Sequence, residues 1–168
     1  MKRNEYLTLR SKFAPKPGKL VIVAESPPAS GKYFYKPAGA VGEPLFAAMM
    51  RQLGFAPTTK EDGLREFQQR GWVLVDATYE PVNSLDRATR DSAISRDYHL
   101  LRADLVVLLS DRSIPIILMK ANVCKLLQPR LSKDGFNVLN AGRVVYFPSH
   151  GRQKDFQRQF GEVLGSAT

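Results

Sequence analysis

One stretch near the N-terminus, Leu20–Ala24, is a continuous apolar run that stops abruptly at Glu25 and a proline-rich turn. Apolar runs of this length without polar alternation are typical of parallel strands that are buried on both faces. The carboxylate then stands at the carboxyl end of a strand, which is where open α/β sheets bind their ligands. Glu25 and the loop after it are therefore the first candidate for a functional site.

A second stretch repeats this pattern further along the chain. The apolar run Trp72–Val75 leads into Asp76, and an aromatic residue and a proline follow at Tyr79 and Pro81. Parallel strands end at the same edge of a sheet, so two strands that each end in an acid predict one shared cleft. The alternative is that Asp76 only caps the turn after the strand. Residue types alone leave both interpretations open.

The rest of the chain alternates between predicted strands and predicted helices. We expect helices over residues 45–53, 60–70, 84–102, 113–127 and 153–164, and strands over residues 104–110, 135–139 and 143–147. Pro115 is compatible with the helix at 113–127 because proline is tolerated in a first turn. No repeat or domain boundary interrupts the pattern. We predict a single α/β domain over residues 1–168, with three α/β/α layers around a central, mostly parallel sheet.

The charge balance points to a polyanionic partner. The chain of 168 residues has a formal net charge of +9 and a pI of about 9.8. Such an excess of positive charge attracts polyanions, and nucleic acid is the commonest of these. A basic protein without such a partner is the alternative.

Several classes of protein fit this composition poorly. The single cysteine, Cys124, excludes an intrachain disulfide framework, and its apolar helical context makes it a core residue. His99 and His150 have no acid or thiol at ligand spacing, so we expect no metal and no cofactor. No apolar stretch approaches the roughly 20 residues that span a bilayer, and the basic N-terminus lacks the apolar core of a signal peptide. We therefore expect a cytoplasmic protein.

Residues 1–19 form a basic N-terminal segment with six lysines and arginines and one acid. Pro15, Pro17 and Gly18 argue against a helix that runs on into the first strand. The segment is either a solvated arm or one that contacts phosphates, and its composition favours the solvated arm.

Two nucleotide-binding motifs are excluded by their spacing. Ser30-Gly31-Lys32 resembles the end of a P-loop, but that motif needs glycine where Ser26 stands and serine or threonine where Tyr33 stands. No Gly-x-Gly-x-x-Gly sequence follows a predicted strand.

What remains is a constellation of acids, aromatic residues and a polar turn: Glu25, Asp76, Tyr33-Phe34-Tyr35, and Pro148 to Arg152. Aromatic rings beside a carboxylate can sandwich a planar base, and the carboxylate can orient a water molecule. A small-residue turn that opens a basic helix can hold a phosphate. The alternative is structural, with the aromatic rings packed against the sheet and the acids capping turns.

At this point the chain resembles the uracil-DNA glycosylase superfamily from about Leu20 onward. Val23 to Pro28 is similar to the family's first motif, Gly-Glu-Ala-Pro-Gly at the end of a strand. Gly71 to Asn83 is similar to the strand that carries a base-reading asparagine and a proline-containing loop. Asp104 to Ser110 and Arg143 to His150 resemble the Leu/Val-rich strand and the strand with a His-Pro-Ser motif. The resemblance implies an α/β/α fold that binds DNA with a base flipped out of the helix.

The resemblance also implies roles for individual residues. Glu25 would orient the attacking water, with His150 as a second catalytic residue. The base would contact Ser26, Phe34, Tyr35 and Asp76. The DNA strand would contact Pro27, Pro148, Ser149, Gly151, Arg152 and Lys154.

Three positions depart from the family pattern. Phe147 stands where the motif has a histidine that stabilises charge on the departing base, and His150 lies three residues later. Asp76 stands in place of the asparagine, and an ionised carboxylate accepts hydrogen bonds without donating any. Pro28 replaces the closing glycine. The iron–sulfur cysteines of some branches are absent.

Three functions follow from these observations. The first is a monomeric DNA glycosylase of base excision repair, which would hydrolyse the N-glycosidic bond of a deaminated or damaged base such as uracil, hypoxanthine or xanthine. The second is a non-catalytic nucleic-acid-binding protein that keeps the fold, which the substitution at Phe147 favours. The third is a hydrolase of free nucleosides or nucleotides, against which the strong positive charge argues.

Overall fold

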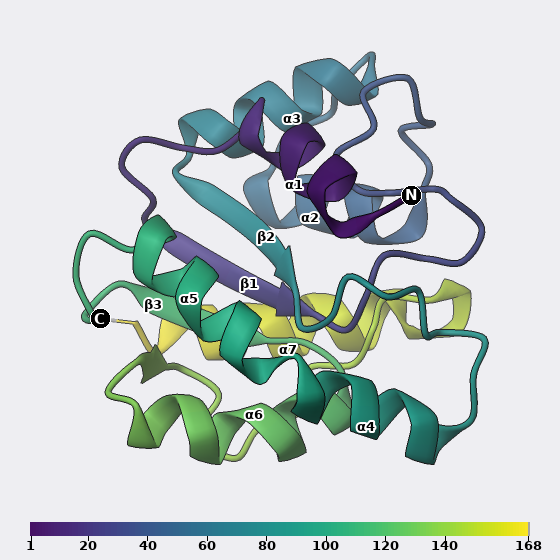
Figure 1. Cartoon of the computed structure of the whole chain (residues 1–168). Helices are drawn as coiled ribbons and strands as arrows, with labels where there is room; N and C mark the ends of the chain where they lie inside the picture. The colour runs from purple at the N-terminus through teal and green to yellow at the C-terminus, as the bar shows by residue number, and fades with distance from the viewer. Residues whose placement is uncertain (168) are drawn as a thin grey trace.

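The computed structural model describes residues 1–167, which form a parallel sheet of four strands between two layers of helices (Figure 1). The strands lie in the order β2-β1-β3-β4, where β1 is Leu20–Ala24, β2 is Trp72–Asp76, β3 is Pro115–Leu118 and β4 is Asn137–Val138. Because all pairs are parallel, the strands end at one edge. Ala24 lies opposite Asp76, which brings the acids at the ends of β1 and β2 to that edge.

The two helical layers cover opposite faces of the sheet (Figure 1). One layer holds α1 (Arg3–Ser11), α2 (Pro44–Leu53), α3 (Lys60–Gln69) and α7 (Gln153–Gly165), and the other holds α4 (Arg87–Arg96), α5 (Tyr98–Leu108) and α6 (Ala121–Lys133). Both faces of β1 are buried: Ile22 packs with the first layer and Val23 with the second. This confirms the predicted α/β/α architecture, and it explains why β1 is uniformly apolar.

The two cores differ in composition. The core under α1, α2, α3 and α7 is rich in aromatic rings, among them Tyr6, Tyr33, Phe34, Tyr35, Phe46 and Phe67. The core under α4, α5 and α6 is mainly aliphatic. The segment Tyr33-Phe34-Tyr35 therefore helps to build the first core directly beside the end of β1.

Local signals explain where several helices begin and end. Pro44 opens α2, and Gly54 ends it at a φ of +65°, a conformation that glycine adopts without steric cost. The Thr59 side chain caps α3 by accepting the N–H of Asp62, and Asp86 caps α4 in the same way.

The strand predicted over residues 104–110 is wrong, and the helix predicted over 113–127 is confirmed only from Ala121 onward, where α6 begins. Residues 104–108 continue helix α5, in which Leu101 and Leu105 are buried while Val106 and Val107 are 49% and 84% exposed. The third strand is β3, which begins at Pro115, and proline is tolerated at the first residue of a strand. Both stretches are short apolar runs, which do not separate strand from helix by periodicity.

Of three other predicted elements, one is confirmed, one is wrong and one is divided in two. A short strand within 135–139 is confirmed as β4. The predicted strand at 143–147 is wrong, because these residues belong to no strand of the sheet, although the N–H of Lys120 donates to the carbonyl of Val145 at 2.7 Å. The helix predicted over 84–102 is two helices, α4 and α5, that meet at Asp97.

The N-terminal segment is not a solvated arm. Residues 3–11 form α1, which buries Tyr6 and Arg10, and Phe13 just beyond it is also buried. The Arg10 guanidinium donates to Asp104 of α5 at 2.6 Å twice and to the Tyr79 hydroxyl at 2.8 Å. α1 ends at Ser11, before Pro15 and Pro17, so no helix runs on into β1, as predicted. The apolar residues of this segment tie it to the first core.

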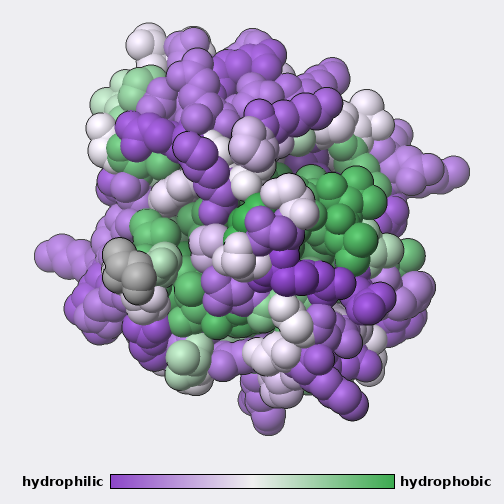
Figure 2. Space-filling view, turned by 90° about the vertical axis from the view of Figure 1, so that its left-hand side faces the viewer, coloured by the Kyte–Doolittle hydropathy of each residue, from purple (hydrophilic) through white to green (hydrophobic). Residues whose placement is uncertain are grey.

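Figure 2 shows the face where the strands begin, on the left of Figure 1, opposite the edge where the acids lie. Hydrophilic side chains dominate this face, with apolar patches between them. Among residues 1–167, no helix combines the length and the apolar character that crossing a bilayer requires.

Candidate functional site

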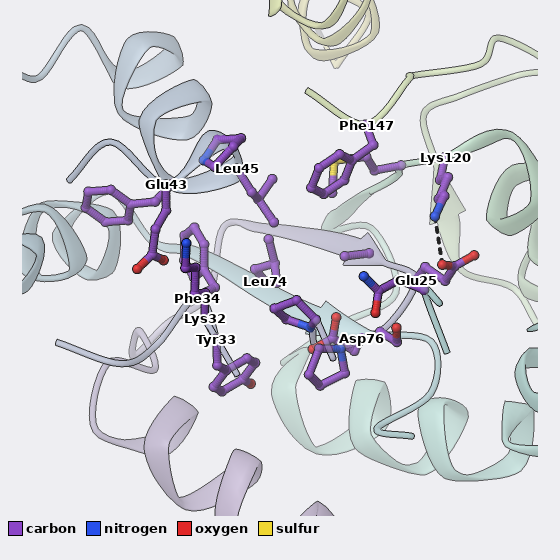
Figure 3. A pocket seen from close by; sticks show the side chains of 18 of the residues that line it. Glu25, Lys32, Tyr33, Phe34, Glu43, Leu45, Leu74, Asp76, Lys120 and Phe147 are labelled. Atoms are coloured by element: carbon purple, nitrogen blue, oxygen red, sulfur yellow. Dashed lines mark hydrogen bonds and ion pairs between the residues drawn. The ribbon is translucent and has the colours of Figure 1, made fainter. Parts of the chain in front are cut away.

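A cavity of about 450 Å³ opens at the carboxyl edge of the sheet (Figure 3). Its walls come from the ends of β1 and β2, the loop after β1, the start of α2 and the segment before α7. Apolar lining residues include Phe34, Leu45, Leu74 and Phe147. The polar and charged lining residues include Glu25, Ser26, Lys32, Tyr33, Glu43, Asp76, Asn83, Arg90 and Lys120. The space is therefore a pocket in which apolar walls meet convergent polar groups, which is typical of a ligand site.

A buried lysine fixes the loop that forms one wall. The Lys60 side chain is fully buried, and its ammonium group donates to the carbonyl of Tyr33 at 2.8 Å and to Glu43 at 2.7 Å. The N–H of Leu74 donates to the Tyr35 hydroxyl at 2.7 Å. These bonds tie the loop to α2, α3 and β2, so the wall is built before any ligand arrives.

Glu25 lies at the centre of a charged cluster on one side of the cavity. Arg90 of α4 donates to both carboxylate oxygens at 2.8–3.1 Å. Lys120 donates to Oε1 at 2.7 Å, and Asn122 of α6 donates to Oε2 at 2.6 Å. We call Glu25, Arg90, Lys120 and Asn122 the Glu25 cluster.

The Glu25 carboxylate is ionised and fully engaged. Burial alone would raise its pKa, but the hydrogen bonds from Arg90, Lys120 and Asn122 outweigh burial and hold the pKa below its usual value. A carboxylate offers about four lone-pair sites, and the cluster fills them. A water molecule bound to Glu25 would have to replace one of these donors.

Lys120 reaches Glu25 from an unusual backbone position. Its φ is +88° and its ψ is 139°, a backbone conformation that residues other than glycine rarely adopt. Its N–H donates to the carbonyl of Val145, and its carbonyl accepts the N–H of Cys124 at 3.0 Å. These bonds hold the backbone between β3 and α6 in this conformation.

Asp76 lies in the opposite kind of environment. It is 3% exposed, and its Oδ2 atom is buried without a hydrogen-bond partner among residues 1–167. Burial raises the pKa of this carboxyl group to about 8, although the nearby Arg10 charge opposes the rise. At neutral pH the group is therefore mainly a neutral acid, which has a hydroxyl donor beside a carbonyl acceptor.

Tyr33, which also lines the cavity, has a second orphaned polar atom. Its ring is buried, and within the described chain its hydroxyl has no hydrogen-bond partner. Burial and the Asp76 charge raise the pKa of this phenol, so it stays protonated. Figure 3 shows Tyr33 and Asp76 on the same side of the cavity. Buried polar groups are almost always satisfied, so two unsatisfied groups here favour a ligand that pairs with them.

The structure brings only part of the sequence-based site together. Glu25, Ser26, Pro27, Phe34 and Asp76 all line the cavity. Ser26 also braces the loop after β2, because its hydroxyl accepts the N–H of Val82 at 3.3 Å. Tyr35 lies behind this wall, fully buried in the core.

The polar turn after Phe147 lies apart from the cavity lining. Phe147 itself lines the cavity, but none of Pro148, Ser149, His150, Gly151, Arg152 and Lys154 does. His150 is exposed at the start of the short 3₁₀ helix η1 (His150–Arg152). Arg152 pairs with Asp155 at 3.1 Å and lies over the ring of Tyr146. His150 therefore does not take the place of the motif histidine in this conformation.

Sequence reasoning missed Arg90, Lys120 and Asn122. Arg90 lies in a polar helix, where arginines usually face solvent. Lys120 and Asn122 fell inside a segment predicted to be one helix, which hid the strand end at Leu118. That strand end is the signal that could have found them, since it puts Lys120 at the same sheet edge as Glu25.

Among residues 1–167, no group of three or more His, Cys, Asp or Glu side chains is placed to hold a metal ion. Cys124 is buried, as expected, and burial raises the pKa of its thiol.

Comparison of the sequence with models of protein families and with curated proteins finds no significant match to either.

Proposed function

We propose that this protein is a DNA glycosylase that hydrolyses the N-glycosidic bond of a deaminated or damaged base. The observation that carries the proposal is the cavity, in which two carboxyl groups with opposite protonation face one apolar space. Glu25 is ionised, whereas Asp76 is mainly neutral near pH 7. Pairs of titratable groups whose surroundings separate their pKa values are typical of acid–base sites.

In this proposal the base enters the cavity beside Phe34 and pairs with Asp76. A neutral carboxyl group can donate to a carbonyl oxygen and accept from the adjacent ring N–H. Uracil, hypoxanthine and xanthine each have such an edge. Recognition through Asp76 therefore suits deaminated bases, and it does not need the asparagine of the family pattern.

In the reaction, the bond between the sugar carbon and the base nitrogen breaks, and its electron pair leaves with the base. A water oxygen bonds to the sugar carbon, and the proton that this water loses goes to the departing base, which is released in its neutral form. Glu25 would orient this water after exchanging one of its donors. Asn122 is the neutral donor, so its replacement by water leaves both ion pairs of Glu25 intact. Positioned acid–base groups of this kind contribute roughly 10²–10⁴-fold to a rate.

Base release from oligonucleotides tests the proposal. Single- and double-stranded DNA would carry uracil, hypoxanthine, xanthine or an alkylated base, and the variant Glu25→Gln would be compared with wild type. Glu80→Gln is a matched control, because Glu80 is an exposed glutamate that pairs with Arg96 outside the cavity lining. We expect release that is lost in Glu25→Gln and kept in Glu80→Gln. Equal release by both variants would reject the mechanism.

A second candidate is a nucleic-acid-binding protein without catalysis. Two observations favour it: the donors that fill the lone pairs of Glu25, and a phenyl ring at Phe147 where the family pattern has a histidine. Salt-dependent binding of DNA by wild type, with no base released from any substrate, would support this function over the first.

A further inference from the structure

The Glu25 cluster has cationic donors left over after Glu25 is satisfied. Arg90 uses Nε and Nη2 on the carboxylate, and within residues 1–167 its Nη1 has no protein partner. Lys120 uses one of its three N–H donors on Oε1. Both side chains line the cavity and are partly exposed, whereas Glu25 is buried. The free donors are therefore available to a ligand, and the carboxylate is the group that holds them in place.

The charges of the cluster do not cancel. Arg90 and Lys120 carry two positive charges and Glu25 one negative charge, which leaves +1. Asp91, which lies 3.3 Å from the Asn122 amide, is matched by Arg87 at 4.0 Å. The neighbouring wall of the cavity is apolar, so this unmatched charge is only weakly screened.

The backbone at Lys120 is a second, independent observation. A residue at a φ of +88° is strained unless it is glycine, and strained positions gather at binding and active sites. Here a lysine occupies a conformation that glycine would adopt freely, and its side chain points to Glu25 at the cavity (Figure 3). The position is consistent with a requirement for the ammonium group.

We propose that Lys120 and Arg90, held by Glu25, form a phosphodiester-binding subsite of the cavity. One singly charged phosphodiester would bring the net charge of the cluster to zero, whereas a phosphomonoester dianion would leave a net negative charge. Arginine and lysine donors together suit phosphate oxygens. The ligand is therefore a nucleotide within a strand, whose backbone phosphate lies at the Glu25 cluster, and the cavity discriminates against free nucleotides.

A phosphate can be located without knowing the base. DNA probes, single- and double-stranded, would carry one abasic tetrahydrofuran nucleotide, which presents sugar and phosphates but no base. In matched probes a neutral methylphosphonate would replace the phosphate on the 5′ or the 3′ side of that nucleotide. Binding of wild type and Lys120→Met would be measured by fluorescence anisotropy over a range of salt concentrations. Lys32→Met is the control, since Lys32 lines the opposite wall (Figure 3) and does not belong to the Glu25 cluster.

We expect Lys120→Met to weaken binding about 10-fold or more and to lower the salt dependence by roughly one phosphate contact. One methylphosphonate should weaken wild-type binding to a similar extent and have little further effect on Lys120→Met, because the two partners share one contact. A 5′-mononucleotide should compete poorly. Lys32→Met should weaken the binding of the probes with and without a methylphosphonate by the same factor.

Other outcomes separate this proposal from the proposed function. If the Lys120 and methylphosphonate effects add independently, or if wild type binds none of the probes, the subsite is rejected. Competition by the mononucleotide at concentrations like those of the DNA would overturn the preference for a diester. If base release depends on Glu25 but the effects of Lys120→Met and of the methylphosphonate are independent, the glycosylase proposal is kept and the subsite is rejected. Coupling without base release would keep the subsite and reject the enzyme.

Discussion

Glu25 and Asp76 stand at neighbouring strand ends, yet their carboxyl groups have opposite surroundings. Glu25 is bound by two cations and an amide, and its pKa is lowered. Asp76 has a buried oxygen with no partner, and burial raises its pKa to about 8. Position on the sheet edge therefore does not decide what an acid does; the helices that pack beside it do.

The two helical layers account for this difference. Glu25 receives its donors from α4 and from the start of α6, which belong to the aliphatic layer with a charged rim. Asp76 lies near Tyr6, Tyr33 and Tyr79 of the aromatic layer. The nearest cation there is Arg10, whose guanidinium is already engaged by Asp104. The layer with α4 and α6 therefore gives Glu25 its cationic donors, whereas the aromatic layer leaves one Asp76 oxygen without a donor among residues 1–167.

The largest expected effect is on stability, when Glu25 is removed. Glu25→Ala leaves two cations facing each other without their shared counter-charge. Breaking a buried ion pair from one side typically costs about 3–5 kcal/mol, and the partial exposure of Arg90 and Lys120 puts this case near the lower value. Urea unfolding measures the change. A loss below about 1 kcal/mol would show that the cluster contributes little to the fold.

The next effect is a change in pH dependence when Asp76 becomes an amide. The folded-state pKa of about 8 lies above the ordinary value of 3.8. Between these pH values the folded state keeps a proton that the unfolded state has released, so the free energy of unfolding falls as pH rises from about 4 to about 8. Asp76→Asn removes this fall and stabilises the protein at pH 8.5 by on the order of a few kcal/mol.

Thermal or urea unfolding of Asp76→Asn at pH 5 and pH 8.5 checks this sign. The gain at pH 8.5 should exceed the gain at pH 5. If the free energies of unfolding of wild type and variant differ by the same amount at both pH values, Asp76 is already ionised in the folded protein. The neutral-acid recognition of the base would then fail with it.

A smaller effect is expected at Asn122. Asn122→Ala removes one donor to Glu25 and leaves both ion pairs, at a cost of about 1–2 kcal/mol by urea unfolding. Because water can take the vacated site, base release that depends on Glu25 should persist in this variant. A loss of stability as large as that of Glu25→Ala, or complete loss of release, would contradict the division of roles within the cluster.

The sequence predicts the central part of this arrangement. The apolar runs of β1 and β2 and the acids that follow them are found where the pattern puts them. The helices near 45–53, 60–70 and 153–164 are also confirmed, because proline, glycine and periodic apolar residues mark them.

The sequence does not predict the partners of the two acids. Arg90 lies 65 positions from Glu25, in a helix whose polar composition is typical of solvated surface. Lys120 lies 95 positions from Glu25, in a segment whose apolar residues favour one continuous helix. The apolar run at 104–110 predicts a strand but belongs to helix α5, and the run at the start of 113–127 predicts a helix but forms strand β3. A short apolar run does not show whether one or both of its faces will be buried. Nor does residue type show that Tyr33 faces the cavity while Tyr35 faces away from it.

The smallest stability effect separates these two tyrosines. The Tyr33 hydroxyl has no partner in the described chain, so Tyr33→Phe should change the free energy of unfolding by less than about 0.5 kcal/mol or raise it. Tyr35→Phe is the matched control: it leaves the N–H of Leu74 unsatisfied and should cost about 1–3 kcal/mol. If a base occupies the cavity, Tyr33→Phe should weaken its binding despite the unchanged fold. Undiminished binding would show that the orphaned hydroxyl belongs to packing and that Asp76 alone faces the ligand.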